Sequence, residues 1–129
     1  MTANRIPKIQ TQITEEMRGI LHGWLVEVHL KFKLLPETLY IAINIIDRYL
    51  ERKFVARGEY QLLGTTAMLI ACKYEERYPP VIEDFVHITD NTYNREQMIR
   101  LEFNILTVLD FNLTFPTCYR FLERFAKIA

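Results

Sequence analysis

The sequence predicts an all-α protein, a single domain of five helices packed around one central apolar helix. Apolar residues recur at intervals of three and four instead of alternating, which indicates helices rather than strands. Glycine and proline are rare, at four and five in 129 residues, so the connections are expected to be short. Residues 67–72 are apolar or small on every face, which is typical of a helix enclosed by other helices.

The totals narrow the functional classes. A chain of 129 residues, half hydrophobic and a quarter charged, is typical of one globular domain. Sixteen basic residues balance sixteen acidic ones, so the basic excess of a nucleic-acid-binding domain is missing. Polar residues follow Met1, and no segment has the length of a membrane span. We therefore expect an intracellular, soluble protein that binds neither nucleic acid nor membrane.

The N-terminal part predicts a polar arm, residues 1–13, followed by the first helix. Thr14 is a suitable N-cap residue for that helix. The negative charges of Glu15 and Glu16 in its first turn interact favourably with the positive end of the helix dipole. The apolar pattern continues to about Lys33, where the helix is expected to end.

The second helix is predicted to open with Pro36, which suits the first helical position, and to continue to Lys53. The third and central helix is predicted to begin near Gly58 and to end before Pro79.

The last part of the chain predicts a short helix over residues 81–89 and a fifth helix that continues to Phe111. Asn94 begins this fifth helix, and Gln97 completes a capping box with it. A sixth helix is expected to open after Pro116, and the chain ends inside it.

Neither metal nor catalytic chemistry is indicated. The two cysteines, Cys72 and Cys118, lack metal-ligand spacing and are expected to be buried free thiols. The three histidines are scattered, with no acid or thiol to complete a ligand set. No activated nucleophile, phosphate-binding glycine loop or facing pair of acids is found. We therefore predict no metal site, no cofactor and no enzymatic activity.

The first helix carries an apolar stripe at helical spacing, beside which Glu27 lies. The stripe consists of Met17, Ile20, Leu21, Trp24 and Val28. Most residues of such a stripe belong to the core. The alternative interpretation is a shallow docking groove with an acid at its rim.

Arg18 and Asp47 are charged residues in otherwise apolar surroundings on the first two helices. A charge on a core-facing position needs a partner. We predict that they form a structural ion pair that fixes how these helices pack.

A cluster of charges, Lys73-Tyr74-Glu75-Glu76-Arg77, ends the central helix. If this helix packs beside the fifth, Lys73 and Glu102 would flank an apolar patch. The centre of that patch would be formed by Tyr74, Phe111 and Leu113. An apolar centre with a few fixed charges is the composition of a protein interface. A surface ion pair over the edge of the core is an equally good interpretation of the pattern.

Several long motifs follow one another along the chain: MRGILHGWLVEV at 17–28, PETL at 36–39, IDRYL at 46–50, LLGTTAMLIACKYEERYPP at 62–80, FVHITDNTY at 85–93 and LEFNILTVLDFNLTFPT at 101–117. In this order they resemble the cyclin box of mitotic cyclins, the A and B types, with a leaning to the B type. The resemblance covers nearly the whole chain.

The resemblance implies a five-helix cyclin box over residues 14–115, with residues 116–129 as the start of a linker or of a following helix. It implies a regulatory subunit that binds and activates a cyclin-dependent protein kinase at the G2/M step, in nucleus and cytoplasm. Such a subunit holds the αC helix of the kinase inward, which aligns the residues that transfer phosphate. The positions that match the family's kinase contacts are Lys73, Tyr74, Glu102, Phe111 and Leu113.

The family also has a groove that docks Arg-x-Leu segments of substrates and inhibitors. The matching positions are Met17, Ile20, Leu21, Trp24, Glu27 and Gln61, with Glu27 expected to meet the arginine. Two departures weaken the match, since Gly23 replaces a usual aspartate and Tyr60 a common leucine. His22 is also unusual for the family.

Mitotic cyclins usually have a second helical box and an N-terminal tail with a destruction signal, and neither is found in these 129 residues. Two alternatives therefore remain beside a kinase activator. One is a transcription-factor-like module with the cyclin fold, and the other is a fragment that binds a kinase without activating it.

Overall fold

The computed structural model describes residues 10–109, and this part of the chain is all-helical, which confirms the predicted fold class. It contains five α-helices and one short 3-10 helix, Arg57–Glu59. The α-helices are α1 (Glu15–Lys31), α2 (Pro36–Leu50), α3 (Tyr60–Glu75), α4 (Ile82–Ile88) and α5 (Arg95–Val108). Within this range, no helix is long and apolar enough to cross a membrane.

The helix N-termini follow the local sequence signals. The Thr14 hydroxyl accepts a hydrogen bond of 3.1 Å from the N–H of Met17 at the start of α1. At the start of α5, Asn94 and Gln97 exchange hydrogen bonds of 2.8 Å, so the predicted capping box is confirmed. Each cap satisfies donors that the first turn of a helix leaves free.

Several predicted helix ends were wrong. Helix α1 ends at Lys31 because Lys33 adopts a left-handed φ of 56°. Helix α2 ends at Leu50 rather than Lys53. At its end, the Gln10 side-chain amide donates to the carbonyl oxygens of Leu50, at 2.7 Å, and Lys53, at 2.5 Å.

The remaining differences lie at both ends of α3, at the end of α5, and at α4, which is one residue shorter at each end than the predicted 81–89. Helix α3 begins at Tyr60 because the residues before it form the 3-10 helix, and it ends at Glu75, earlier than predicted. Helix α5 was predicted to reach Phe111 and ends at Val108.

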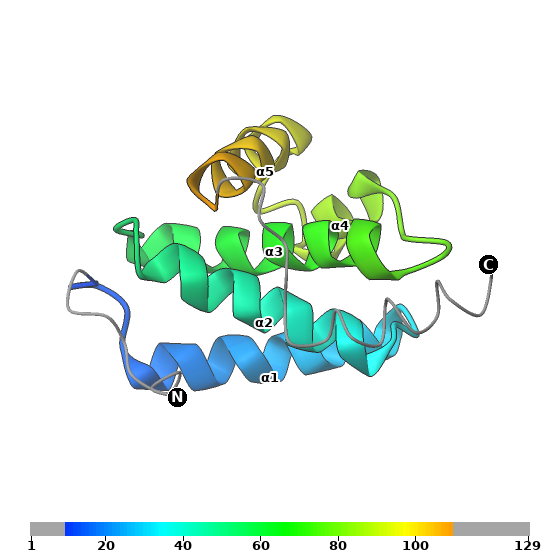
Figure 1. Cartoon of the computed structure of the whole chain (residues 1–129), viewed down its shortest axis with the longest axis horizontal. Coiled ribbons are helices and arrows are strands. Elements are labelled where there is room, and N and C mark those ends of the chain that lie inside the picture. Colours follow the sequence, from blue (N-terminus) through cyan, green and yellow to red (C-terminus); the bar gives the residue numbers. More distant parts are fainter. Residues whose placement is uncertain (1–9, 110–129) are drawn as a thin grey trace.

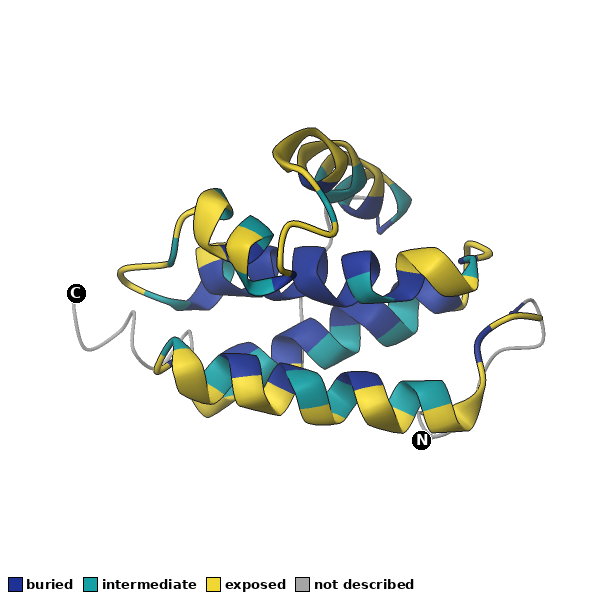
Figure 2. Ribbon diagram, turned by 180° about the vertical axis from the view of Figure 1, so that it is seen from behind, coloured by how far each residue is buried: buried dark blue, intermediate teal, exposed yellow. Residues whose placement is uncertain are grey.

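Helix α3 is the centre of the fold, as predicted. It crosses the molecule between the α1–α2 pair on one side and α4 with α5 on the other (Figure 1). Burial colouring shows α3 as the most enclosed helix, whereas the outer faces of α1, α4 and α5 are exposed (Figure 2). The largest fully buried side chains come from every α-helix and include Leu25, Ile41, Met68, Phe85 and Ile105.

Candidate functional site

Helix α3 has only three residues that are not buried: Gln61, Lys73 and Tyr74. All three had been predicted as site residues. Gln61 lies in the first turn of α3, and the other two lie in its last turn. The exposed surface of the central helix is therefore confined to its two ends. Gln61 belongs to the predicted substrate-docking groove, and Lys73 and Tyr74 belong to the predicted kinase-binding surface.

At the C-terminal end of α3, the Lys73 Nζ donates a hydrogen bond of 2.7 Å to Glu102 Oε2 of α5. The Lys73 side chain is 53% exposed and that of Glu102 is 17% exposed. Tyr74 is half-buried and packs against the core. The pair and the aromatic ring thus lie at the junction of two helices, where a partner can reach them.

The remaining predicted kinase contacts, Phe111 and Leu113, lie outside the residues that the structure describes.

The charge cluster at the end of α3 separates into different environments. Glu75 is buried, and the guanidinium of Arg77 lies 5.6 Å from the centre of the exposed Tyr78 ring. Glu76 Oε2 accepts hydrogen bonds from the N–H of Leu35, at 2.7 Å, and from the Thr38 hydroxyl, at 2.5 Å. Part of the cluster therefore belongs to the fold rather than to a free surface.

Sequence reasoning missed this role of Glu76. The available signal was Leu35, which precedes the predicted helix start at Pro36 and has no side-chain acceptor. When a helix begins without a capping side chain of its own, an acceptor from elsewhere in the fold can bind the free N–H groups of its first turn.

The predicted groove residues have different surroundings. Ile20 is 68% exposed and Glu27 is exposed, whereas Leu21 is 5% exposed. Met17 and Trp24 are half-buried and pack against the core.

Leu21 is buried, and its side chain lies beside Gly64 of α3, so it offers little surface to the predicted groove, which stays a prediction. Gln61 lies one turn before Gly64, so both occupy the face of α3 that meets α1. Gly23, where the family usually has an aspartate, has no neighbouring heavy atom near its missing β-carbon. The surface beside it is open.

Arg18 Nη2 lies 2.9 Å from Asp47 Oδ2, which joins α1 to α2. Both side chains are largely buried, at 13% and 22% exposed. Burial raises the pKa of Asp47, and the Arg18 guanidinium opposes that shift.

His22 and Tyr60, two of the three residues that depart from the family pattern, are both close enough to Arg18 and Asp47 for those charges to affect their pKa values. Burial, and then Arg18, lower the pKa of His22. Burial raises the pKa of Tyr60 to about 12. Asp47 also acts on both groups, so a polar cluster lies where α1, α2 and α3 meet.

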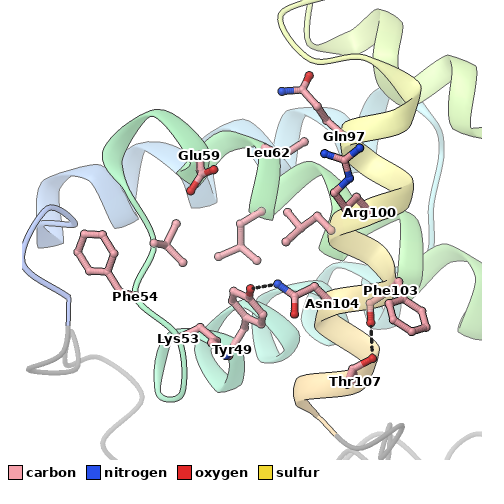
Figure 3. Close-up of a pocket in the computed structure, with 13 residues that line it drawn as sticks. Tyr49, Lys53, Phe54, Glu59, Leu62, Gln97, Arg100, Phe103, Asn104 and Thr107 are labelled. Carbon is pink, nitrogen blue, oxygen red and sulfur yellow. Dashed lines mark hydrogen bonds between the residues drawn. The ribbon is translucent and has the colours of Figure 1, made fainter.

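A cavity of about 630 Å³ opens at the other end of α3, between the end of α2 and α5 (Figure 3). The Tyr49 hydroxyl accepts a hydrogen bond of 3.0 Å from the Asn104 side chain inside it. Phe54 and Phe103 contribute apolar surface, and Lys53 and Arg100 contribute positive charge. None of the predicted site residues within 10–109 lines this cavity.

Cys72 is a buried free thiol whose pKa burial raises to about 12, so it is not a reactive nucleophile. The other predicted thiol, Cys118, lies outside the described residues. Among residues 10–109, no group of three or more potential ligands is placed to hold a metal ion.

Comparison with known proteins gives one consistent family. The family model described as "Cyclin, N-terminal domain" matches residues 1–114. Cyclin-B1-4 of Arabidopsis thaliana is 54% identical over 120 residues, which is 93% of this chain and 31% of that protein. The G2/mitotic-specific cyclin-B of Marthasterias glacialis is 57% identical over 116 residues, 90% of this chain and 30% of that protein.

Among solved structures, a viral cyclin from herpesvirus saimiri has a similar fold, with a TM-score of 0.77 and 25% identity. The superposition covers 83% of this chain and 47% of the viral protein. This chain spans about a third of the length of the two curated relatives that it matches.

Proposed function

This chain belongs to the cyclin family, and on that premise we propose that it is the N-terminal cyclin box of a mitotic cyclin, a regulatory subunit that binds and activates a cyclin-dependent protein kinase. It has no catalytic role of its own in this proposal. Its place of action would be the nucleus and the cytoplasm, at the G2/M step.

The observation that carries the proposal is the surface at the end of α3. An enclosed helix exposes Lys73 and Tyr74 in its last turn, and Glu102 of α5 holds the lysine at 2.7 Å. The three residues occupy positions that match the family's kinase contacts. Because the Lys73 side chain is half-exposed, it can donate further hydrogen bonds to a partner without leaving Glu102.

Kinase activation would follow from differential binding. A surface that binds the kinase better when its αC helix lies inward shifts the kinase toward that state. The inward helix brings its glutamate to the lysine that holds the nucleotide phosphates, as phosphoryl transfer requires. Half-exposed Tyr74 would supply apolar contact area, and Lys73 would hydrogen-bond the kinase backbone.

The α1 surface would recruit substrates or inhibitors that carry an Arg-x-Leu segment. Exposed Ile20 would receive the leucine and exposed Glu27 the arginine, with Trp24 and Gln61 beside them. Gly23 leaves this surface without the usual second acid, so we expect weaker attraction for the arginine than in relatives that have it.

The first experiment mixes the purified chain with a monomeric cyclin-dependent kinase and measures complex formation and histone phosphorylation. We expect both for the wild-type chain, and neither for Lys73→Ala combined with Glu102→Ala. The matched control removes one exposed cation and one exposed anion at the other end of α3, Lys53→Ala with Glu59→Ala. This control should bind and activate like the wild type.

Binding without phosphorylation would identify a kinase-binding module that does not activate. Binding of DNA that weakens with salt, together with no kinase binding, would support the transcription-factor-like alternative.

A further inference from the structure

Glu76 connects the end of the central helix to the start of α2. Its own N–H donates to the Cys72 carbonyl oxygen at 2.8 Å, which closes the last turn of α3. Its carboxylate reaches the other helix, where Oε2 accepts from the Leu35 N–H and the Thr38 hydroxyl. One residue therefore caps the end of one helix and the beginning of another.

Helix α2 needs this group because its local sequence provides no cap. The capping position is Leu35, which makes no side-chain hydrogen bond, and Pro36 has no N–H to donate. A negative charge is favourable at a helix N-terminus because the peptide dipoles point their positive ends there. Thr38 is fully buried, so its hydroxyl also depends on the Glu76 carboxylate as an acceptor.

The residues of the proposed kinase surface are immediately next to this contact. Lys73 lies three residues before Glu76, and Tyr74 lies two residues before it. The Lys73 ammonium group is fixed by its hydrogen bond to Glu102. The backbone of the same helical turn is fixed to α2 by the hydrogen bond between Glu76 and the Leu35 N–H. Any shift of the last turn of α3 relative to α2 would move the lysine away from its place beside α5.

We propose that Glu76 is a positioning residue for kinase binding, which fixes the last turn of α3 against the start of α2 and so presents Lys73 and Tyr74 in the geometry that the kinase accepts. The inference rests on the proposed function of that surface. Glu76 is half-buried and its bound oxygen is occupied within the chain, so the role needs no direct contact with the kinase.

The test compares kinase affinity and thermal stability in the same variants. Glu76→Ala should weaken binding of a monomeric cyclin-dependent kinase by roughly tenfold or more, the effect of losing charge-assisted hydrogen bonds. Glu76→Gln keeps an acceptor oxygen without the charge and should recover part of that loss. Glu59→Gln, the same change at the opposite end of α3, should leave the affinity unchanged.

A second substitution separates positioning from stability. Leu35→Asp gives α2 a cap of its own and should restore the melting temperature of the Glu76→Gln protein. It cannot restore the link between α2 and the end of α3. We therefore expect the Glu76→Gln, Leu35→Asp double variant to melt like the wild type and to bind the kinase as weakly as Glu76→Gln alone.

The outcomes distinguish this inference from the proposed function. If the wild-type chain binds no kinase, both are overturned. If the wild type binds and Glu76→Ala binds equally well, the inference fails and the proposed function stands. If the double variant regains wild-type affinity together with its melting temperature, Glu76 only stabilises α2, and the positioning role is refuted.

Discussion

Gly64 of α3 lies so close to Leu21 of α1 that a β-carbon on Gly64 would stand 2.9 Å from Leu21 Cδ1. Carbon atoms in well-packed interiors keep a separation of roughly 3.5–4.0 Å. Glycine is therefore the residue that permits this approach of the two helices. The contact places α1 against the N-terminal half of α3, beside Gln61 and the proposed docking groove.

Gly64→Ala should therefore lower the free energy of unfolding by about 1 kcal/mol. Overpacking costs about 1–3 kcal/mol, and the better helix propensity of alanine offsets about 1 kcal/mol of that. Urea denaturation measures the change. Leu21→Val, which shortens the facing side chain, should reduce the penalty of Gly64→Ala in a double-mutant cycle. A Gly64→Ala protein more stable than the wild type would show that Leu21 moves aside at no cost.

The helices and their central member were predictable because apolar periodicity and capping residues act within a few positions of the chain. The end of α2 was not predictable, because the carbonyl oxygen of its last residue, Leu50, accepts a hydrogen bond from the side chain of Gln10, forty residues away. The same glutamine accepts from the N–H of Val55, and it is buried although it lies in the predicted polar arm. A contact between distant segments leaves no local periodicity from which to predict it.

The candidate site likewise has features that the sequence predicted and features that only the fold shows. The sequence predicted that Lys73 and Glu102 would flank one apolar patch if the third and fifth helices packed side by side, and the structure brings the two side chains together. Helical spacing placed Ile20 and Leu21 together in one stripe, although one is exposed and the other buried. Which edge of a stripe faces the core depends on the helices packed against it, and these are known only from the fold.

This difference makes Ile20 the better probe of the docking groove. Ile20→Ala should change stability by less than about 0.5 kcal/mol, because the side chain is exposed. It should reduce the affinity for an Arg-x-Leu peptide, measured by fluorescence anisotropy. Leu21→Ala is the structural comparison and should cost about 2–5 kcal/mol. Unchanged peptide affinity in Ile20→Ala would exclude Ile20 from the groove.

The Arg18–Asp47 pair should show the behaviour of a largely buried ion pair. Asp47→Leu alone leaves the arginine without its carboxylate and should destabilise the protein by about 2–4 kcal/mol. Arg18→Met combined with Asp47→Leu removes both charges and should cost less than the single change. Thermal denaturation of both variants provides the comparison. A double variant less stable than Asp47→Leu would mean that Arg18 contributes mainly through its other contacts.

His22 should make the folded state sensitive to mild acid. Its pKa is lowered from 6.5 by burial and by Arg18, so the unfolded chain binds the proton more readily. The contribution of His22 is therefore complete above about pH 6.5 and is lost as the pH falls toward the lowered value. Asp47, whose pKa is raised, acts in the opposite sense at lower pH.

Unfolding free energies measured between pH 7.5 and 5 should accordingly decline on the acid side, and His22→Leu should flatten the decline. Asp47 remains in that variant, so any slope left near pH 5 is not due to His22. An identical slope in wild type and variant would show that His22 does not control acid stability.

Exchanging the charges of Lys73 and Glu102 separates their bond within the chain from their role toward a partner. Lys73→Glu alone places two carboxylates together and should destabilise by up to about 1 kcal/mol, since the pair is partly exposed. Adding Glu102→Lys restores the attraction, so the double variant should melt within a few degrees of the wild type. Kinase binding should not return if Lys73 makes the proposed contact, because the donor at the end of α3 has become an acceptor. Isothermal titration calorimetry with a monomeric cyclin-dependent kinase measures the affinity. Wild-type affinity in the exchanged protein would show that the pair acts only within the chain and does not contribute to kinase binding.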